Sequence, residues 1–505
     1  MTDHHGSTVG QENGQPAHDQ ALDPRLQVVI VDPAARVVAD STTRFTPWRL
    51  IRRLLTWLGA IFAVNVVGLF GGLFAYLGGV ANWALPWRLL SGLAAIAIYG
   101  FINIRPCAPA QAPATKTTNR LLAGYELLLA AGVAGLSNIA LWIWLGLSLH
   151  GHSGAGGWAL FIGNAVVGLI ALLGLALGGF IRVAMHSTQV PLSRRLFLLF
   201  FWWFPPTTVL VIGPMMRIID HELGVTALRE RRDAARCGSA ICATRYPLLM
   251  VHGVFFRDWS AFNYWGRIPD QLEAFGARIH YGGQQSSASV AQSAAELAAT
   301  IRRIVAETGC GKVNIIAHSK GGLDARWAIS QLGVADLVAS LTTINTPHRG
   351  CNFARQLLEK IPDKVVGQIS SSYDNLFSRL GDVAPDFLGG VVDLTDTECA
   401  RLNQAMPDAA GVLYQSLGSM MASRFAAPFP LNLGYSLIQP VDGDNDGLVA
   451  VSSMAWGNWL GVIRPSGKQG ISHADMIDLL RRDIGDFDVV ETYVQLVDGL
   501  RRRGY

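Results

Sequence analysis

Residues 313–322, VNIIAHSKGG, decide the fold of the C-terminal half of the chain. A β-branched apolar run typical of a buried strand leads into Ala317-His318-Ser319, and a helical pattern follows two glycines. A nucleophile at the apex of such a turn needs small residues two positions before and after it, because strand and helix pass closely there. Ala317 and Gly321 meet this need, so the pattern predicts Ser319 as a nucleophile. An ordinary serine in a strand–turn–helix connection is the alternative.

Strand and helix patterns alternate on both sides of this turn. Strands are predicted at 246–251, 278–281 and 338–344, and helices at 270–275, 289–307 and 323–332. Short connections between alternating strands and helices predict a mostly parallel, doubly wound sheet. We therefore expect an α/β domain at residues 245–505.

The N-terminal part of the chain has a different composition. The whole chain of 505 residues is 15% charged and 50% hydrophobic, with a mean hydropathy of +0.30. In residues 55–216 the only acid is Glu126, which we interpret as a helix-end residue. Five apolar runs lie at about 55–79, 89–104, 127–149, 158–181 and 196–216, and about 20 apolar residues cross a bilayer core. These runs predict a helical transmembrane domain of about five spans at 55–216.

The flanking segments complete the predicted organisation. Residues 1–54 are polar and lack the apolar core of a signal peptide, so we expect a disordered tail. Residues 217–244 are rich in arginine and are predicted to be a basic linker. The alternating charge of the loops favours five spans with the N-terminus inside, which places the α/β domain on the periplasmic side of the inner (cell) membrane. The arginines at 217–236 disagree, and a re-entrant fifth run, kinked at Pro205-Pro206, would keep the domain inside.

Composition also excludes several functional classes. The basic pI of about 8.7 comes from the excess of Lys and Arg around the apolar runs, which we interpret as a membrane topology signal. Nucleic-acid binding would require a cluster of basic residues on a soluble face, and the sequence shows none. Six scattered cysteines form neither a disulfide framework nor a zinc ligand set. The apolar runs contain no pair of carboxylates of the kind that would suggest a transporter.

Further motifs occur in order along the last half of the chain. They lie at residues 243–253, 312–322, 341–350, 394–407 and 445–449, and include the dipeptide His252-Gly253 and the segment TPHRG at 346–350. With these motifs the chain resembles the true triacylglycerol lipases of Gram-negative bacteria, which have the α/β-hydrolase fold. Ala317 departs from the family's G-x-S-x-G pattern. The resemblance does not extend to residues 1–216.

The resemblance implies a catalytic triad in the order serine, acid, histidine. Asp446, in Asn-Asp-Gly after a predicted strand, matches the family's acid. His473 is the only histidine that follows His348, and it stands before a helix predicted at 475–481. By family position, the backbone N–H groups of Val254 and Lys320 would form the oxyanion hole.

Metal and lid expectations also follow from the resemblance. Asp475 matches one ligand of the family's structural calcium, but Leu479 replaces an expected glutamine, so calcium remains a possibility; no cofactor is needed for the chemistry. The family's disulfide is missing, because Ser452 stands at its second cysteine. An EF-hand at 442–453 is rejected, since its twelfth position is a serine and 448–454 is rich in strand formers. Apolar residues between 351 and 392 fit either a lid or ordinary core helices, and the resemblance favours the lid, because these lipases carry one in this region.

Together, the apolar runs and the resemblance predict a membrane-anchored serine lipase or esterase that hydrolyses fatty acid esters through an acyl-enzyme. Its expected partners are a lipid ester and the bilayer, and the sequence does not show whether a folding helper is needed. A phospholipase or lipid acyltransferase with the same triad is an alternative. A further alternative is a non-catalytic membrane sensor or partner-binding module with a degenerate hydrolase domain.

Overall fold

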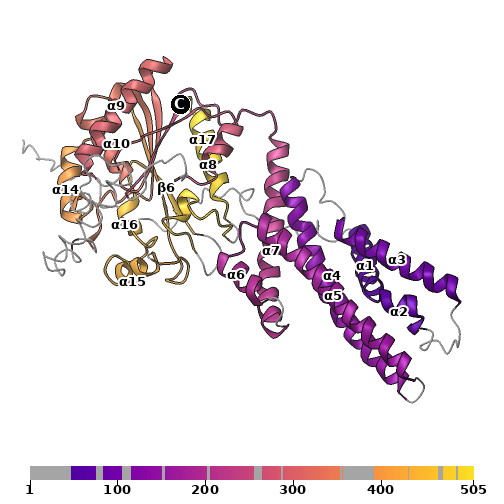
Figure 1. Cartoon of the computed structure of the whole chain (residues 1–505). Coiled ribbons are helices and arrows are strands. Elements are labelled where there is room, and N and C mark those ends of the chain that lie inside the picture. The colour runs from indigo at the N-terminus through magenta and orange to yellow at the C-terminus, as the bar shows by residue number, and fades with distance from the viewer. Residues whose placement is uncertain are drawn as a thin grey trace, which may run out of the picture.

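The computed structural model describes residues 47–74, 84–104, 115–150, 154–201, 205–254, 264–285, 288–352, 355, 392–429, 431–464, 470–484 and 487–505. Figure 1 shows a long group of helices that runs away from a C-terminal domain built around one sheet. Residues 1–46 of the predicted tail lie outside the described residues. So does the predicted lid at 351–392, except for residues 351, 352, 355 and 392.

The sheet of the C-terminal domain is parallel, as predicted. Its order is β2-β1-β3-β4-β5-β6, and every neighbouring pair is parallel. The strands are β1 (Leu248–Val251), β2 (Ile279–Tyr281), β3 (Val313–His318), β4 (Val338–Ile344), β5 (Leu413–Ser419) and β6 (Asn458–Ile463). β1, β3 and β4 are buried at every position, as expected of strands covered on both faces.

Helices cover both faces of the sheet. Leu248 and Ile316 pack with α8 (Ile268–Ala274) and α17 (Val489–Arg502) on one face. The adjacent residues of the same strands, Leu249 and Ile315, pack on the other face of the sheet with α9 (Val290–Thr308) and α10 (Gly321–Gln331). Successive side chains of a strand point to opposite faces, so each strand supplies both halves of the core. The doubly wound arrangement is therefore confirmed.

The remaining described elements of this domain are helices, and the first of them ends directly before β4. They are η3 (Ala335–Leu337), α14 (Asp396–Ala405), α15 (Leu431–Asp442), α16 (Val451–Met454) and η4 (Asp475–Ile477). Two expectations were wrong here. The residues before Asp446, where a strand was predicted, form the helix α15, and the helix predicted at 475–481 stops after one 3-10 turn. It stops because Asp478, held by two hydrogen bonds from the guanidinium of Arg267, adopts the left-handed conformation (φ 54°).

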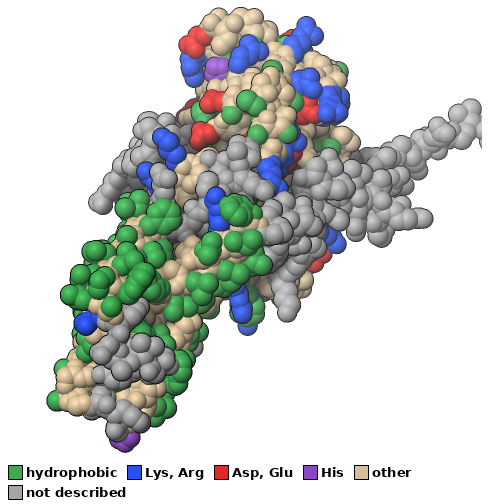
Figure 2. Space-filling view, turned by 90° about the vertical axis from the view of Figure 1, so that its right-hand side faces the viewer, with side chains coloured by type: hydrophobic (Ala, Val, Ile, Leu, Met, Phe, Trp, Pro, Cys, Tyr) green, Lys and Arg blue, Asp and Glu red, His purple; other side chains and the backbone are tan. Residues whose placement is uncertain are grey.

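The N-terminal region contains seven helices among the described residues. They are α1 (Pro47–Ala63), α2 (Val66–Gly71), α3 (Leu85–Ile104), α4 (Lys116–Leu149), α5 (Ala155–His186), α6 (Leu192–Phe201) and α7 (Pro205–Ala235). Three of them, α3, α4 and α5, are long and apolar enough to cross a membrane. Figure 2 shows hydrophobic side chains over the surface of this bundle, while charged side chains gather on the C-terminal domain. The five predicted spans are not confirmed.

The first predicted run differs from expectation because the helix breaks at Asn65. The Asn65 side chain donates to Asn138 Oδ1 (2.5 Å), and its own oxygen accepts from Asn164 Nδ2 (2.8 Å) and from the Trp142 indole (2.8 Å). Asn164 in turn accepts the backbone N–H of Gly68 (2.7 Å). A break in a helix leaves backbone N–H groups without partners inside the helix, and this buried network supplies one for Gly68. The network therefore stabilises the break between α1 and α2.

Glu126 also differs from its expected role as a plain helix-end residue. Its carboxylate is buried and accepts Arg53 Nε at 3.0 and 3.2 Å, together with a close contact from Arg53 Nη2. The ion pair joins the first half of α1 to the first half of α4. The one acid of the apolar block therefore fixes how these two helices pack.

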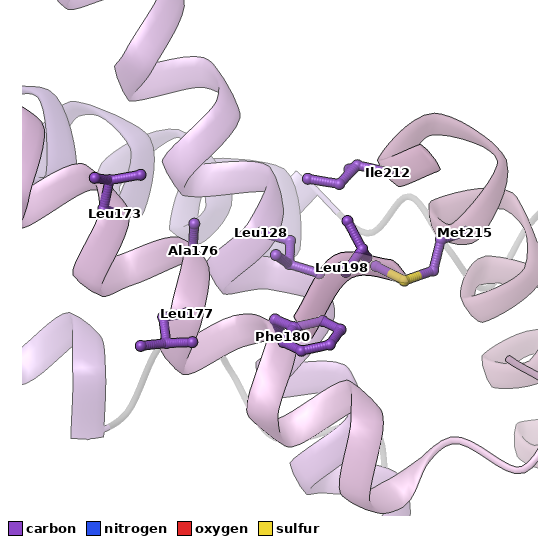
Figure 3. Close-up of a pocket in the computed structure, with 8 residues that line it drawn as sticks. All are labelled: Leu128, Leu173, Ala176, Leu177, Phe180, Leu198, Ile212 and Met215. Atoms are coloured by element: carbon purple, nitrogen blue, oxygen red, sulfur yellow. The ribbon is translucent and has the colours of Figure 1, made fainter. Parts of the chain in front are cut away.

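The fifth predicted run is divided between two helices. α6 is ten residues long, and α7 begins at Pro205 and packs back against α6. Figure 1 shows the pair as a hairpin beside α4 and α5. Between the hairpin and the bundle lies an apolar pocket of about 70 Å³ (Figure 3). It is lined by Leu128, Leu173, Ala176, Leu177, Phe180, Leu198, Ile212 and Met215.

The predicted basic linker at 217–244 is helical as far as Ala235, because α7 continues through residue 216 without a break. Its arginines pair with acids of the C-terminal domain. Arg229 contacts Asp483 (2.5 Å) and Asp488 (3.0 Å), while Arg232 contacts Asp488 (2.9 Å). Arg236 contacts Glu491 (2.7 Å). α7 is thus ion-paired to the segment that precedes and begins α17.

Candidate active site

Ser319 stands at the apex of the turn between β3 and α10. Its backbone is in the left-handed region (φ 55°), and its carbonyl accepts the Thr346 hydroxyl (2.8 Å). The two glycines after Lys320 are needed because neighbouring chains approach closely. A Cβ at Gly321 would lie 2.4 Å from the His252 carbonyl, and one at Gly322 would lie 2.2 Å from Thr346 Oγ1. The strained serine and the small residues beside it have the local geometry of a nucleophile elbow.

Asp446 and His473 are hydrogen-bonded to each other. His473 Nδ1 lies 2.6 Å from Asp446 Oδ2, and both side chains are buried. The other oxygen of Asp446 accepts the backbone N–H groups of Leu448 (2.9 Å) and Val449 (2.8 Å). A carboxylate accepts only, so Nδ1 carries the proton and Nε2 is left as an acceptor. His473 therefore has the tautomer that a general base requires.

His318 links the nucleophile turn to this pair. Its ring centroid lies 4.4 Å from that of His473, and Ser319 is the next residue. Burial, with a further contribution from His473, lowers the pKa of His318 well below its ordinary value, so its ring is neutral at physiological pH. Ser319 follows β3 at the carboxyl edge of the sheet, where parallel sheets place their sites.

The two predicted oxyanion donors, Val254 and Lys320, are each one residue away from a position that adjoins or is Ser319. A Cβ at Gly253 would lie 2.7 Å from Ser319 Cβ, so the loop with Val254 passes directly beside the serine. Lys320 precedes the first residue of α10, and its side chain points into the domain toward Ser293 Oγ (3.0 Å) and Asp324 Oδ1 (2.8 Å). Only the main chain of Lys320 is therefore near Ser319.

Two residues of the site were missed in the sequence. Asn345, just after β4, donates to Asp446 Oδ2 (2.6 Å) and to Ser419 Oγ (2.7 Å). Tyr264 Oη accepts the Gly253 N–H (3.0 Å) and lies 2.7 Å from His318 Nδ1. Both support other site residues. The phrase Asn-Thr-Pro-His at 345–348 was the only sequence signal for Asn345.

Asp475 does not fit a calcium ion. One carboxylate oxygen accepts the Ser472 N–H (3.0 Å) and hydroxyl (2.6 Å), and the other accepts Arg482 Nη2 (3.0 Å). The carboxylate is thus already paired with a guanidinium. Among the residues that the structure describes, no group of three or more histidine, cysteine, aspartate or glutamate side chains is arranged to hold a metal ion. The described cysteines, 237, 242, 310, 351 and 399, are all free thiols.

Known proteins resemble mainly the C-terminal half of this chain. A triacylglycerol lipase of Burkholderia plantarii is 34% identical over 188 residues, which are 35% of this chain and 52% of that protein. A triacylglycerol lipase of Vibrio cholerae is 30% identical over 287 residues, which are 52% of this chain and 89% of that protein. The chain spans about half the length of the first curated relatives it matches. The crystal structure of a metagenomic carboxyl esterase covers 52% of this chain and 76% of its own, with 16% identity and a TM-score of 0.41. No family model matches the chain.

Proposed function

The chain belongs through its C-terminal half to the family of triacylglycerol lipases, and we propose that it hydrolyses carboxylic esters of fatty acids with Ser319 as the nucleophile. The hydrogen bond between His473 Nδ1 and Asp446 Oδ2 carries this proposal. It leaves Nε2 of His473 as the base, and His318 joins the base to the serine turn. The substrate is a triacylglycerol or a related lipid ester.

In the proposed reaction, His473 Nε2 takes the proton of the Ser319 hydroxyl while the oxygen attacks the ester carbonyl. Asp446 orients the ring and stabilises the imidazolium. The N–H groups of Val254 and Lys320 bind the oxyanion, and the alcohol leaves with the proton from His473. Water, activated by the same histidine, then releases the fatty acid from the acyl-enzyme.

The test compares membranes from cells that express wild type, Ser319→Ala or Ser330→Ala, a matched serine change on α10. The substrates are short- and long-chain nitrophenyl esters. Loss of the nucleophile is expected to lower the rate by about 10³-fold or more, and Ser330→Ala to leave it near wild type. Equal background rates from wild type and Ser319→Ala would overturn the proposal.

For the membrane region we propose four crossings of the inner (cell) membrane, with the hydrolase domain on the cytoplasmic side. The sequence favoured the periplasmic side, but the contacts support the alternative of a re-entrant fifth run. α1 and α2 together extend over residues 47–71 and make the first crossing; α3, α4 and α5 make the others. The hairpin of α6 and the start of α7 enters the bilayer and returns to the same side.

Contacts at the two ends of the bundle support this arrangement. At one end lie the Arg53–Glu126 pair, the bond from Arg182 Nη2 to the Asn103 carbonyl (2.6 Å), and Gln189, which contacts the carbonyl of Arg481 (2.9 Å). This end carries most of the loop arginines and touches the hydrolase domain. At the other end Leu73, Leu145 and Leu149 cluster, and the short loop between α4 and α5 has no Lys or Arg. The positive-inside rule then assigns the arginine-rich end to the cytoplasm.

A further inference from the structure

An exposed apolar stripe runs along α15 and the loop before it. We call it the α15 stripe; its residues and exposed fractions are Phe425 (82%), Phe429 (75%), Leu433 (50%), Leu437 (40%) and Val441 (40%). Leu433, Leu437 and Val441 are four positions apart on α15, a spacing that puts them on one face of the helix, and the two phenylalanines lie in the loop before it. No charged residue occurs in the 17 positions from 425 to 441. Contiguous apolar surface of this kind marks an interaction site.

The opposite face of α15 rests on the candidate active site. Leu431 and Ile438 are buried, and Leu431 packs in a cluster with Met421 and with Ala474, the residue after His473. A Cβ at Gly434 would lie 2.0 Å from the Gly447 carbonyl, so the helix touches the turn of Asp446 as well. α15 thus has one face on the two loops that carry the acid and the base, and its other face is apolar and uncovered.

A lipid leaflet fits this surface better than a folded partner. Figure 1 shows α15 and α6 on the lower side of the molecule, toward which the bundle runs, with α9 on the upper side. α6 also exposes apolar residues at helical spacing, namely Leu192, Leu196, Leu199 and Phe200. At the edge of the stripe Arg424 lies over the Phe425 ring (4.8 Å), and arginines at such an edge match anionic headgroups.

We propose that the α15 stripe docks in the leaflet that holds the α6–α7 hairpin, so that the active site opens onto the bilayer surface. This inference rests on the proposed membrane anchoring and the proposed esterase activity. It names the surface that presents lipid to Ser319. The occupant is the bilayer itself, and a second copy of the chain is the competing occupant.

The first experiment measures where the stripe lies. Leu433→Cys is labelled with an environment-sensitive fluorophore in full-length protein whose Cys107, Cys237 and Cys310 are serine, and the protein is reconstituted in anionic phospholipid vesicles. Quenching by spin-labelled lipid is compared with quenching by aqueous iodide. Leu147→Cys in the bundle and Arg303→Cys on α9 are the lipid and water controls, since both side chains are exposed. Lipid quenching at 433 and 147, but not at 303, is expected.

The controls separate the possible failures. Lipid quenching at 147 without quenching at 433 would overturn the docking surface and leave the membrane anchor standing. No lipid quenching at 147 would overturn the anchor as well. If neither quencher affects the label at 433, and iodide quenches it only after the protein is diluted, the stripe would be assigned to contact with a second copy of the chain.

The second experiment measures activity through this surface. In Leu433→Glu, the ratio of the rate on a long-chain ester in vesicles to that on a soluble short-chain ester is expected to fall about tenfold, because a carboxylate resists entry into the leaflet. Leu433→Met is expected to keep the wild-type ratio. An unchanged ratio in Leu433→Glu, or an equal loss on both esters, would contradict the proposal.

Discussion

Asn345 is the residue through which β4 acts on the proposed triad. Its side chain donates to the oxygen of Asp446 that also accepts from His473. Asn345→Ala removes a hydrogen bond to a charged group, which is worth about 1.5–3 kcal/mol, so kcat/KM is expected to fall about 10- to 100-fold. The measurement is the steady-state rate on a soluble ester.

The pH–rate profile distinguishes a role of Asn345 in positioning the Asp446–His473 pair from a general loss of structure. Asn345→Asp adds a negative charge near His473 that favours the imidazolium, so the acid limb of the pH–rate profile is expected to move to higher pH. A variant that lowers the rate equally at every pH, with the limb unmoved, would assign Asn345 a structural role only.

Lys320 and Asp324 form a buried ion pair directly after Ser319 in the chain. Burial outweighs the attraction of Lys320 and raises the pKa of Asp324 to about 7. Asp324→Asn removes the ion-pair partner of the buried Lys320 ammonium and is expected to lower the free energy of unfolding by about 3–5 kcal/mol. The double variant Lys320→Met, Asp324→Leu buries no charge and is expected to be more stable than Asp324→Asn. Thermal unfolding in detergent checks this order, and the reverse order would contradict it.

At the scale of elements, the ion pairs between α7 and α17 make stability depend on pH. Burial alone would raise the pKa of Asp488, but Arg229 and Arg232 outweigh it and hold this pKa well below its usual range. A lowered carboxyl pKa stabilises the fold above the unfolded value of about 4, and the contribution is lost as pH falls below it. Wild type is therefore expected to exceed Asp488→Asn by about 3–5 kcal/mol at pH 7 and by less below pH 4.

Denaturant unfolding at several pH values provides the measurement. Glu307→Gln is the control, because its pair with Arg303 is exposed on both sides and is worth at most about 1 kcal/mol. A constant difference between wild type and Asp488→Asn from pH 7 to pH 3 would contradict this account of the interface.

Local patterns predicted some elements well and failed where distant residues decide. The strand at 338–344 was predicted to the residue, because its apolar and β-branched residues can be recognised from the local sequence alone. The break at Asn65 could not be predicted, since its partners Asn138 and Asn164 lie 73 and 99 positions away. The helix predicted at 475–481 failed for the same reason, as Arg267 captures Asp478 from across the domain.

The site shows the same division. Ser319 has a local signature of small residues around a turn, and Asp446 and His473 were predicted because the family motif and the order of histidines left few choices. Their hydrogen bond agrees with the assigned roles, which remain predictions. Asn345 and Tyr264 act through contacts across the fold, and an asparagine or tyrosine on its own predicts no such contact.

At the scale of the whole molecule, four crossings predict which surfaces face the cytoplasm. In intact, right-side-out spheroplasts, a membrane-impermeant maleimide is expected to label Ala155→Cys, at the start of α5. Arg303→Cys on α9 is expected to react only after permeabilisation. The same background, with serine at 107, 237 and 310, serves both variants. Labelling of Arg303→Cys in intact spheroplasts would restore the periplasmic arrangement that the loop charges first favoured.

α7 has a mechanical consequence for the enzyme. Its 31 residues extend over about 46 Å, from the hairpin that we propose enters the bilayer to the ion pairs with Asp483, Asp488 and Glu491. Each residue added to α7 would lift the domain by about 1.5 Å and turn it by about 100°. In the proposed membrane arrangement, the length of α7 therefore sets the height and the orientation of Ser319 above the lipid.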